Sequence, residues 1–127
     1  MTHVAALTFA VVALGVVVFQ IALALGAPRG GFAMGGAFPG RFPPPLRVAA
    51  FVQAVVVAAL AIIVLSAAGV VAPDLTVRLP WLAWVPVAFS ALALVLNAIS
   101  RSAGERRLWV PVTLVMLISS LVVALGG

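Results

Sequence analysis

Four long apolar stretches occupy most of the 127-residue chain, and nearly every charge lies between them. The stretches run roughly from Val4 to Gly26, Val48 to Val71, Trp81 to Ile99 and Leu108 to Leu125. Each is close to the ~20 residues that a helix needs to cross ~30 Å of hydrocarbon. Since 66% of the residues are hydrophobic and 7% are charged, the chain has too little polar surface to stay soluble as a monomer. The sequence therefore predicts an all-α fold: one integral membrane four-helix bundle over residues 1–127, with helices at about 4–26, 47–71, 80–99 and 104–125 and an interfacial loop at 27–46.

Composition excludes several classes of chemistry. The chain has no cysteine, one histidine (His3) and two acidic residues (Asp74 and Glu105), so we expect no metal site. Its seven basic residues are all arginine, which excludes a Schiff-base lysine. We expect no cofactor, no catalytic residue and no enzymatic activity. The net charge of +5 does not indicate a nucleic-acid partner, because arginines at the helix ends of a membrane protein set topology and contact anionic lipid headgroups.

The arginines are distributed unevenly between the two sides of the predicted bundle. The first and third loops share a side and hold six of them: Arg29, Arg41, Arg47, Arg101, Arg106 and Arg107. The opposite side holds Arg78 alone. The positive-inside rule then predicts an inner (plasma) membrane protein with both termini outside. A cleaved signal peptide is the rival interpretation of the first stretch, which lacks a basic leading region and has a longer apolar core than such peptides.

The first loop, from Gly26 to Arg47, contains six glycines and five prolines, so it cannot form a regular helix or strand. It is also unusually apolar for a solvated linker, and its large side chains are a candidate lid over the bundle: Phe32, Met34, Phe38 and Phe42. An ordered interfacial lid and a mobile linker both remain open. The triplet Pro43-Pro44-Pro45 is expected to be an extended lead-in to the second helix.

Residues at the ends of the stretches resemble interface anchors. They are the tryptophans Trp81, Trp84 and Trp109 and the arginines Arg47, Arg101, Arg106 and Arg107. Ser102 and Glu105 have capping-box spacing, which starts the last helix near Ala103. Gly15, in the middle of the first helix, is expected to let another helix approach closely.

One polar side chain from each helix falls at a similar depth. At 1.5 Å per residue, Gln20, Gln53 and Thr113 lie about 9 Å, and Asn97 about 6 Å, from the end of the bundle that carries the first and third loops. Amides are costly in lipid unless they are paired, so this candidate polar layer should point into the bundle. It is either a structural clamp, in which the amides bond each other or backbone carbonyls, or a small polar pocket. No titratable residue is expected in the layer.

Two sets of loop patterns resemble a group of small four-helix bacterial membrane proteins. They are G-A-P-R-G, G-G and P-P-P-L-R in the first loop, and S-A-G-E-R-R-L-W-V-P in the third. The resemblance implies a four-helix membrane domain and transfers no activity. Small multidrug exporters fit less well, because they need a carboxylate in the first helix. Dual-topology fluoride channels also fit less well, because the charge bias here is one-sided.

Two functions remain open at the level of sequence. The first is a non-enzymatic accessory or partner-binding subunit, suggested by the lack of titratable groups in the bilayer. The alternative is a small oligomeric transporter or channel that uses the amide layer and the first loop. The expected partners are the lipid bilayer, anionic headgroups, and a second copy of the chain or a larger membrane protein.

Overall fold

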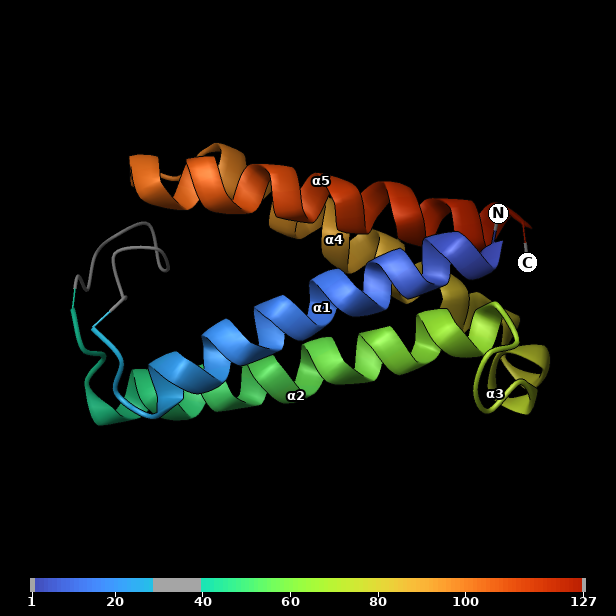
Figure 1. The fold of residues 1–127 in the computed structure, drawn as a ribbon, viewed down its shortest axis with the longest axis horizontal. Coiled ribbons are helices and arrows are strands. Elements are labelled where there is room, and N and C mark those ends of the chain that lie inside the picture. The colour runs from blue at the N-terminus through green and yellow to red at the C-terminus, as the bar shows by residue number, and fades with distance from the viewer. Residues whose placement is uncertain (1, 29–39, 127) are drawn as a thin grey trace.

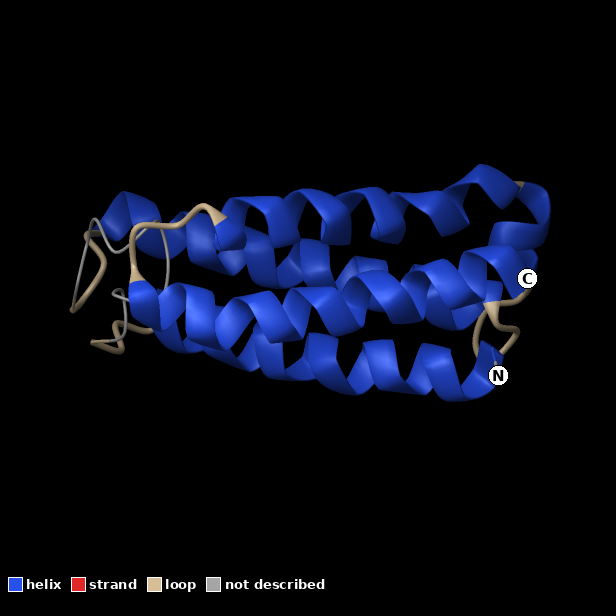
Figure 2. Ribbon diagram, turned by 90° about the horizontal axis from the view of Figure 1, so that it is seen from above, coloured by secondary structure: helices blue, strands red, loops and turns tan. Residues whose placement is uncertain are grey.

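The computed structural model describes residues 2–28 and 40–126 as a bundle of four long helices (Figures 1 and 2). These helices are α1 (Thr2–Ala24), α2 (Pro44–Ala67), α4 (Trp84–Ala98) and α5 (Ala103–Gly126). A short helix, α3 (Asp74–Arg78), and a 3₁₀ helix, η3 (Pro80–Ala83), connect α2 to α4. The described residues contain no strand. The predicted all-α four-helix fold is confirmed.

The bundle consists of two antiparallel hairpins, α1–α2 and α4–α5 (Figure 1). The last turn of α1, the first turn of α2 and the connection between α4 and α5 lie at one end, here called the loop end (Figure 1). The first turn of α1, the last turn of α5 and α3 lie at the opposite, terminal end. Among the described residues, four segments are long and apolar enough to cross a membrane: Thr2–Ala24, Pro44–Ala67, Pro80–Ala98 and Ala103–Gly126. The protein is therefore a small multi-pass membrane protein.

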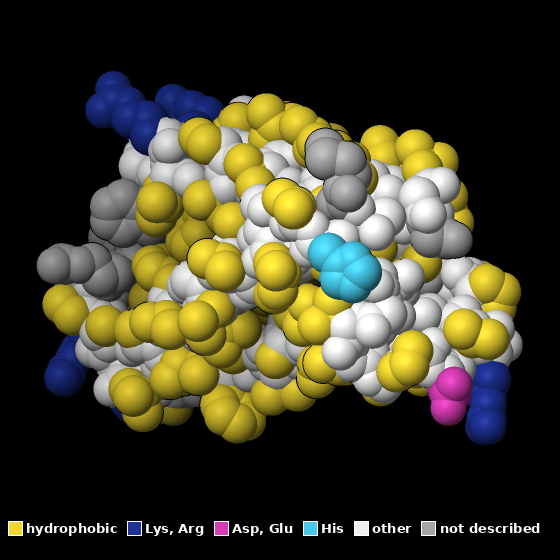
Figure 3. Space-filling model, turned by 45° about the vertical axis from the view of Figure 1, so that its right-hand side comes forward, with side chains coloured by type: hydrophobic (Ala, Val, Ile, Leu, Met, Phe, Trp, Pro, Cys, Tyr) yellow, Lys and Arg dark blue, Asp and Glu magenta, His cyan; other side chains and the backbone are white. Residues whose placement is uncertain are grey.

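Helix α1 shows why the outside of the bundle suits lipid. Its exposed apolar side chains recur every three or four residues, at Val4, Leu7, Val11, Leu14 and Val18. Ala6, Phe9 and Ala13 form the opposite, buried stripe. In Figure 3 hydrophobic side chains cover much of the visible surface, and the basic ones gather at its edges. Apolar exposure on this scale matches a hydrocarbon surrounding rather than water.

Helix α2 begins three residues before the expected position. Pro43 is extended (φ −63°, ψ 159°), but Pro44 and Pro45 already belong to the first turn of the helix. The expectation of a fully extended triplet was thus wrong for two of its three residues. Proline suits a first turn because its φ is already helical and the amide N–H groups at that position have no intrahelical partner.

A glycine with positive φ follows each helix of the first hairpin: Gly26 follows α1 and Gly69 follows α2. Gly26 and Gly69 have φ of 97° and 78°, a conformation that glycine adopts without steric cost. After Gly69, the Val70 N–H donates to the Leu65 carbonyl at 2.9 Å, and the Gly69 N–H donates to the Ser66 carbonyl at 2.9 Å. This pair of bonds is a Schellman motif, and it stops α2 at Ala67 rather than near Val71.

The second connection is more structured than the expected short loop. The Ser66 hydroxyl donates to the Ala72 carbonyl at 2.7 Å and lies 3.2 Å from the Thr76 hydroxyl. Ala72 has a positive φ of 41°, so this bond holds a backbone conformation that alanine seldom adopts. The buried hydroxyl pair therefore ties α3 to the end of α2.

The main core fills the terminal half of the bundle. Its buried members come from three helices: Ala6, Phe9, Ala13, Val57, Leu60, Val64, Met116 and Val123. At the terminal end α1 and α5 touch, since a Cβ on Gly126 would lie 2.7 Å from Cγ2 of Thr2. Toward the loop end α1 and α5 diverge (Figure 1). A second small cluster there, formed by Leu23, Phe42 and Ala50, belongs to the first hairpin alone.

Candidate functional site

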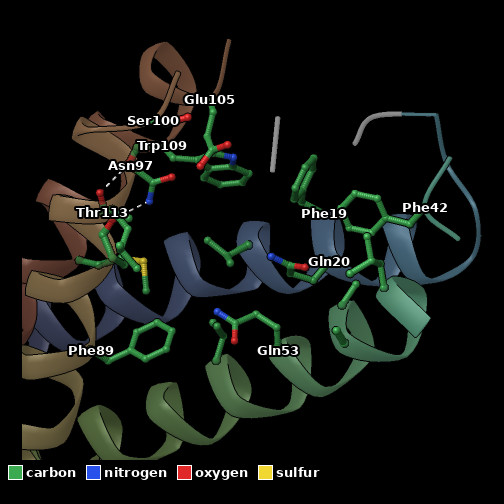
Figure 4. A pocket seen from close by; sticks show the side chains of 18 residues that line it. Phe19, Gln20, Phe42, Gln53, Phe89, Asn97, Ser100, Glu105, Trp109 and Thr113 are labelled. Carbon is green, nitrogen blue, oxygen red and sulfur yellow. Dashed lines mark hydrogen bonds between the residues drawn. The ribbon is translucent and has the colours of Figure 1, made fainter. Parts of the chain in front are cut away.

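The divergence of the hairpins leaves a cavity of about 520 Å³ in the loop half of the bundle (Figure 4). All four long helices contribute to its walls, among them Gln20 of α1, Gln53 of α2, Asn97 of α4 and Thr113 of α5. The volume is within the ~300–1,000 Å³ of typical small-molecule sites. Most of the other lining residues are apolar, so the cavity combines an apolar wall with a few polar groups.

The cavity ends at an apolar floor. Val57 and Met116 line it and also belong to the main core, and Phe89 lines it and packs against that core. Beyond this floor the buried residues include Phe9, Leu60 and Val64, so a polar solute would meet close-packed hydrocarbon. The cavity is therefore one-sided, on the loop half of the bundle.

The structure places the four residues of the sequence-derived polar layer in the walls of this one cavity. Gln20 and Gln53 are half-buried, and their carboxamides point into it from neighbouring helices (Figure 4). Neither carboxamide makes a hydrogen bond within the part of the chain that the structure describes. Two amides in apolar surroundings without partners are costly, which calls for water or a ligand beside them.

Asn97 and Thr113 make local hydrogen bonds instead of reaching across the bundle. The Asn97 Nδ2 donates to the Ala93 carbonyl at 2.7 Å. The Thr113 hydroxyl donates to the Trp109 carbonyl at 2.6 Å. Both are bonds to the preceding helical turn, which polar side chains in membrane helices often make. Among the described residues, no hydrogen bond joins one member of the layer to another, and the bonds of Asn97 and Thr113 to backbone carbonyls stay within their own helices.

Glu105 also lines the cavity, which corrects the expectation that no titratable residue lies at this level. It is 8% exposed and is the single charged side chain among the lining residues in the described ranges. Its backbone N–H donates to the Ser102 hydroxyl at 3.2 Å, so the spacing read as a capping box does cap α5. The same helix turn that needs the cap thus brings the carboxylate to the mouth of the cavity (Figure 4).

Aromatic rings complete the mouth. Phe19 and Trp109 meet edge to face with ring centroids 4.8 Å apart, and Phe42 is buried against Leu23 and Ala50. Trp109, expected as an interface anchor, is half-buried and faces the cavity. Of the candidate lid, Phe42 lines the cavity, whereas Phe32, Met34 and Phe38 lie outside the described residues.

The remaining expected anchors lie at the two ends of the bundle. Trp81 and Trp84 are 60% and 45% exposed, next to η3 at the terminal end. Arg101 and Arg107 are exposed at the loop end. Arg106 donates from a terminal guanidinium nitrogen to the Ser100 carbonyl, and Arg47 is half-buried and donates to a carbonyl of α1.

The spacing of the lining residues could have identified Glu105 and Trp109 from sequence. On α5 the inward positions recur every three or four residues: Glu105, Trp109, Thr113, Met116, Ser120 and Val123. Counting back from the buried small and polar residues of this stripe reaches Trp109 and then Glu105. In the sequence, the charged residues of the third loop beside Glu105 obscure this periodicity.

The described residues contain no group of three or more His, Cys, Asp or Glu side chains that could hold a metal ion. No family model, no curated protein and no solved structure matches the chain. The resemblance of the loop patterns to small four-helix bacterial proteins therefore stays a prediction.

Proposed function

We propose that this protein is a non-enzymatic membrane protein that binds a small, mainly apolar molecule with a hydrogen-bonding group in the cavity between its hairpins. The observation that carries the proposal is the pair of carboxamides on Gln20 and Gln53, which face the cavity without a partner in the described chain. A ligand that donates to one amide and accepts from the other would satisfy both. Its apolar part would contact the rings of Phe19, Phe89 and Trp109.

The aromatic lining of the cavity favours a neutral or positively charged ligand over an anion. Phe19, Phe89 and Trp109 contribute rings to its walls. Aromatic faces attract cations and disfavour anions. General acid–base catalysis would require a second positioned titratable group in the lining. Ligand binding therefore explains this site better than catalysis does.

The packed floor favours a binding site over an open channel. The alternative from sequence, a small transporter or channel, would need a path past Val57, Phe89 and Met116. In the arrangement seen here that path is filled by the main core. An accessory role remains compatible with the proposal, because a subunit that senses a ligand for a larger membrane protein would use the same cavity.

The arginine asymmetry supports an orientation in which the cavity is on the cytoplasmic half of the inner membrane. Arg41, Arg47, Arg101, Arg106 and Arg107 belong to the loop end, and Arg78 to the terminal end. Positively charged loops stay in the cytoplasm, so the ligand would come from the cytoplasmic leaflet or the cytoplasm itself.

Trp109 offers a direct optical test. Of the three tryptophans, Trp81 and Trp84 lie at the terminal end, so a Trp81→Phe/Trp84→Phe variant reports on the cavity alone. Bromododecanol, a neutral amphiphile whose bromine quenches indole fluorescence on contact, is titrated into this variant in detergent. We expect saturable quenching that weakens when Gln53 is replaced by leucine.

The matched control is Val55→Leu on the lipid-facing side of the same helix, where the side chain is 54% exposed. The bromododecanol should quench the Trp109 fluorescence of this variant as strongly as that of its parent. Linear, non-saturating quenching that is identical in all three proteins would mean that the bromoalkanol reaches Trp109 only through the detergent, and would refute the proposal.

A further inference from the structure

Two arginines that are not among the lining residues of the cavity donate hydrogen bonds to the carboxyl end of α1. The Nε of Arg47 donates to the Ala24 carbonyl at 2.8 Å, and the Nε of Arg41 donates to the Gly26 carbonyl at 2.8 Å. The last carbonyls of a helix lack intrahelical partners and carry the negative end of its dipole. Arg41 and Arg47, which lie 15 and 23 positions further along the chain than their acceptors, therefore return to the same helix end.

Both guanidinium groups lie against one glycine. A Cβ built on Gly26 would be 3.4 Å from Nη2 of Arg47 and 3.7 Å from Nε of Arg41. Each arginine uses its Nε for a carbonyl, and within the described residues their terminal nitrogens make no hydrogen bond. Two neighbouring cations repel each other, and a helix end of about −0.5 charge offsets only part of the charge they carry.

An apolar groove begins beside this arginine pair. It is lined by Ala24, Leu25, Pro44, Arg47, Val48 and Phe51 and has a volume of about 420 Å³. Leu25, Val48 and Phe51 are 76%, 65% and 56% exposed, so this face meets the lipid. The basic groups thus lie where the loop end of the bundle reaches the headgroup level, directly next to a hydrocarbon-facing groove.

We propose that Arg41 and Arg47 form a binding site for one anionic phospholipid, with its phosphate on the terminal guanidinium nitrogens and an acyl chain in the groove along Leu25, Val48 and Phe51. Guanidinium groups bind phosphate oxygens through paired, charge-assisted hydrogen bonds. The phosphate would neutralise the repulsion between the two arginines. This site is separate from the interhelical cavity and does not depend on a ligand there.

Native mass spectrometry in a non-ionic detergent tests the site with four probes. They are phosphatidylglycerol, phosphatidylcholine, diacylglycerol with the same acyl chains, and inorganic phosphate. We expect one phosphatidylglycerol per chain to bind most tightly, because only this probe combines a net negative phosphate headgroup with the chains. Arg41→Gln and Arg47→Gln should each weaken its binding by about tenfold, the effect of losing one charge-assisted contact.

Arg107→Gln is the matched control, since Arg107 is exposed at the same end of the bundle but belongs to the other hairpin. It should change phosphatidylglycerol binding less than about twofold, in keeping with a screened surface charge. Arg41 is exposed, so Arg41→Gln tests the site even if Arg47→Gln fails to fold. Equal losses in all three variants would show diffuse attraction, and equal binding of inorganic phosphate would show a free-anion site; either result overturns the proposal.

Discussion

Phe19 of α1 and Trp109 of α5 meet edge to face, with ring centroids 4.8 Å apart and an interplanar angle of 63°. This contact joins the two hairpins in the loop half of the bundle, where their helices diverge (Figure 1). At the terminal end the same two helices approach through Thr2 and Gly126. A small residue at one end and two large rings at the other make the space between the hairpins a wedge, and the cavity occupies its wide part.

The aromatic contact should contribute measurably to stability. We expect Phe19→Leu to lower the free energy of unfolding by about 0.5–1.5 kcal/mol, the contribution of an aromatic pair beyond its buried area. Phe51→Leu is the control, because Phe51 faces lipid and is 56% exposed. Thermal or denaturant unfolding in detergent measures both variants. Equal stability of the two would mean that the ring contact does not hold the hairpins together.

Removing a polar side chain should lower the free energy of unfolding only where that side chain makes a hydrogen bond within the bundle. Ser66→Ala deletes a hydroxyl that bonds the Ala72 carbonyl and the Thr76 hydroxyl, so we expect a loss of about 1 kcal/mol. Gln53→Leu removes a carboxamide without a bond in the described chain, so the unfolding free energy should stay the same or rise. A larger loss for Gln53→Leu than for Ser66→Ala would instead favour the structural clamp.

Much of the fold could be predicted from sequence because lipid imposes simple rules. A bilayer demands long apolar helices, and the four segments follow from length and hydropathy alone. The rise of 1.5 Å per residue predicted a similar depth in the bundle for one set of polar residues, and the structure places all of them in one cavity: Gln20, Gln53, Asn97 and Thr113. Whether their side chains bond each other did not follow, because that depends on the angle at which the hairpins diverge.

Local packing choices were the other part that sequence rules could not settle. Gly15 was expected at a close helix contact, yet it is exposed and a Cβ there would meet nothing within 4 Å. A glycine in a membrane helix can face either another helix or the lipid, so its presence in the sequence does not show which of the two it meets. Glu105 belongs both to a helix cap and to a cavity wall, and its spacing from Ser102 in the sequence indicates only the first role.

The two glycines Gly69 and Gly15 should respond oppositely to alanine. Gly69→Ala places a side chain at φ of 78° with nothing within 4 Å, so its cost of about 1 kcal/mol is purely conformational. Gly15→Ala adds a methyl group to a helix interior in open space, so it should be neutral or stabilise by up to about 1 kcal/mol. Unfolding curves of the two variants against the parent provide the comparison. Destabilisation by Gly15→Ala would place an unseen partner against that face of α1.

The topology prediction rests on six arginines against one. A phosphatase that is active only outside the cytoplasm should work when fused to the C-terminus. A fluorescent protein that folds only in the cytoplasm should work when inserted between Arg101 and Ser102. The reverse pattern would move the cavity to the outer half of the membrane.

Cysteine accessibility can show whether the one-sided cavity between the hairpins is reached from the loop end, because the natural chain contains no cysteine. Single cysteines replace Gln53 in the cavity wall, Leu60 in the core and Val55 on the lipid face of α2, and each is treated with a charged, water-soluble thiosulfonate. We expect rapid modification at position 53 from the loop side of the membrane, and slow modification at positions 60 and 55. Modification at position 53 as slow as at position 60 would contradict this expectation.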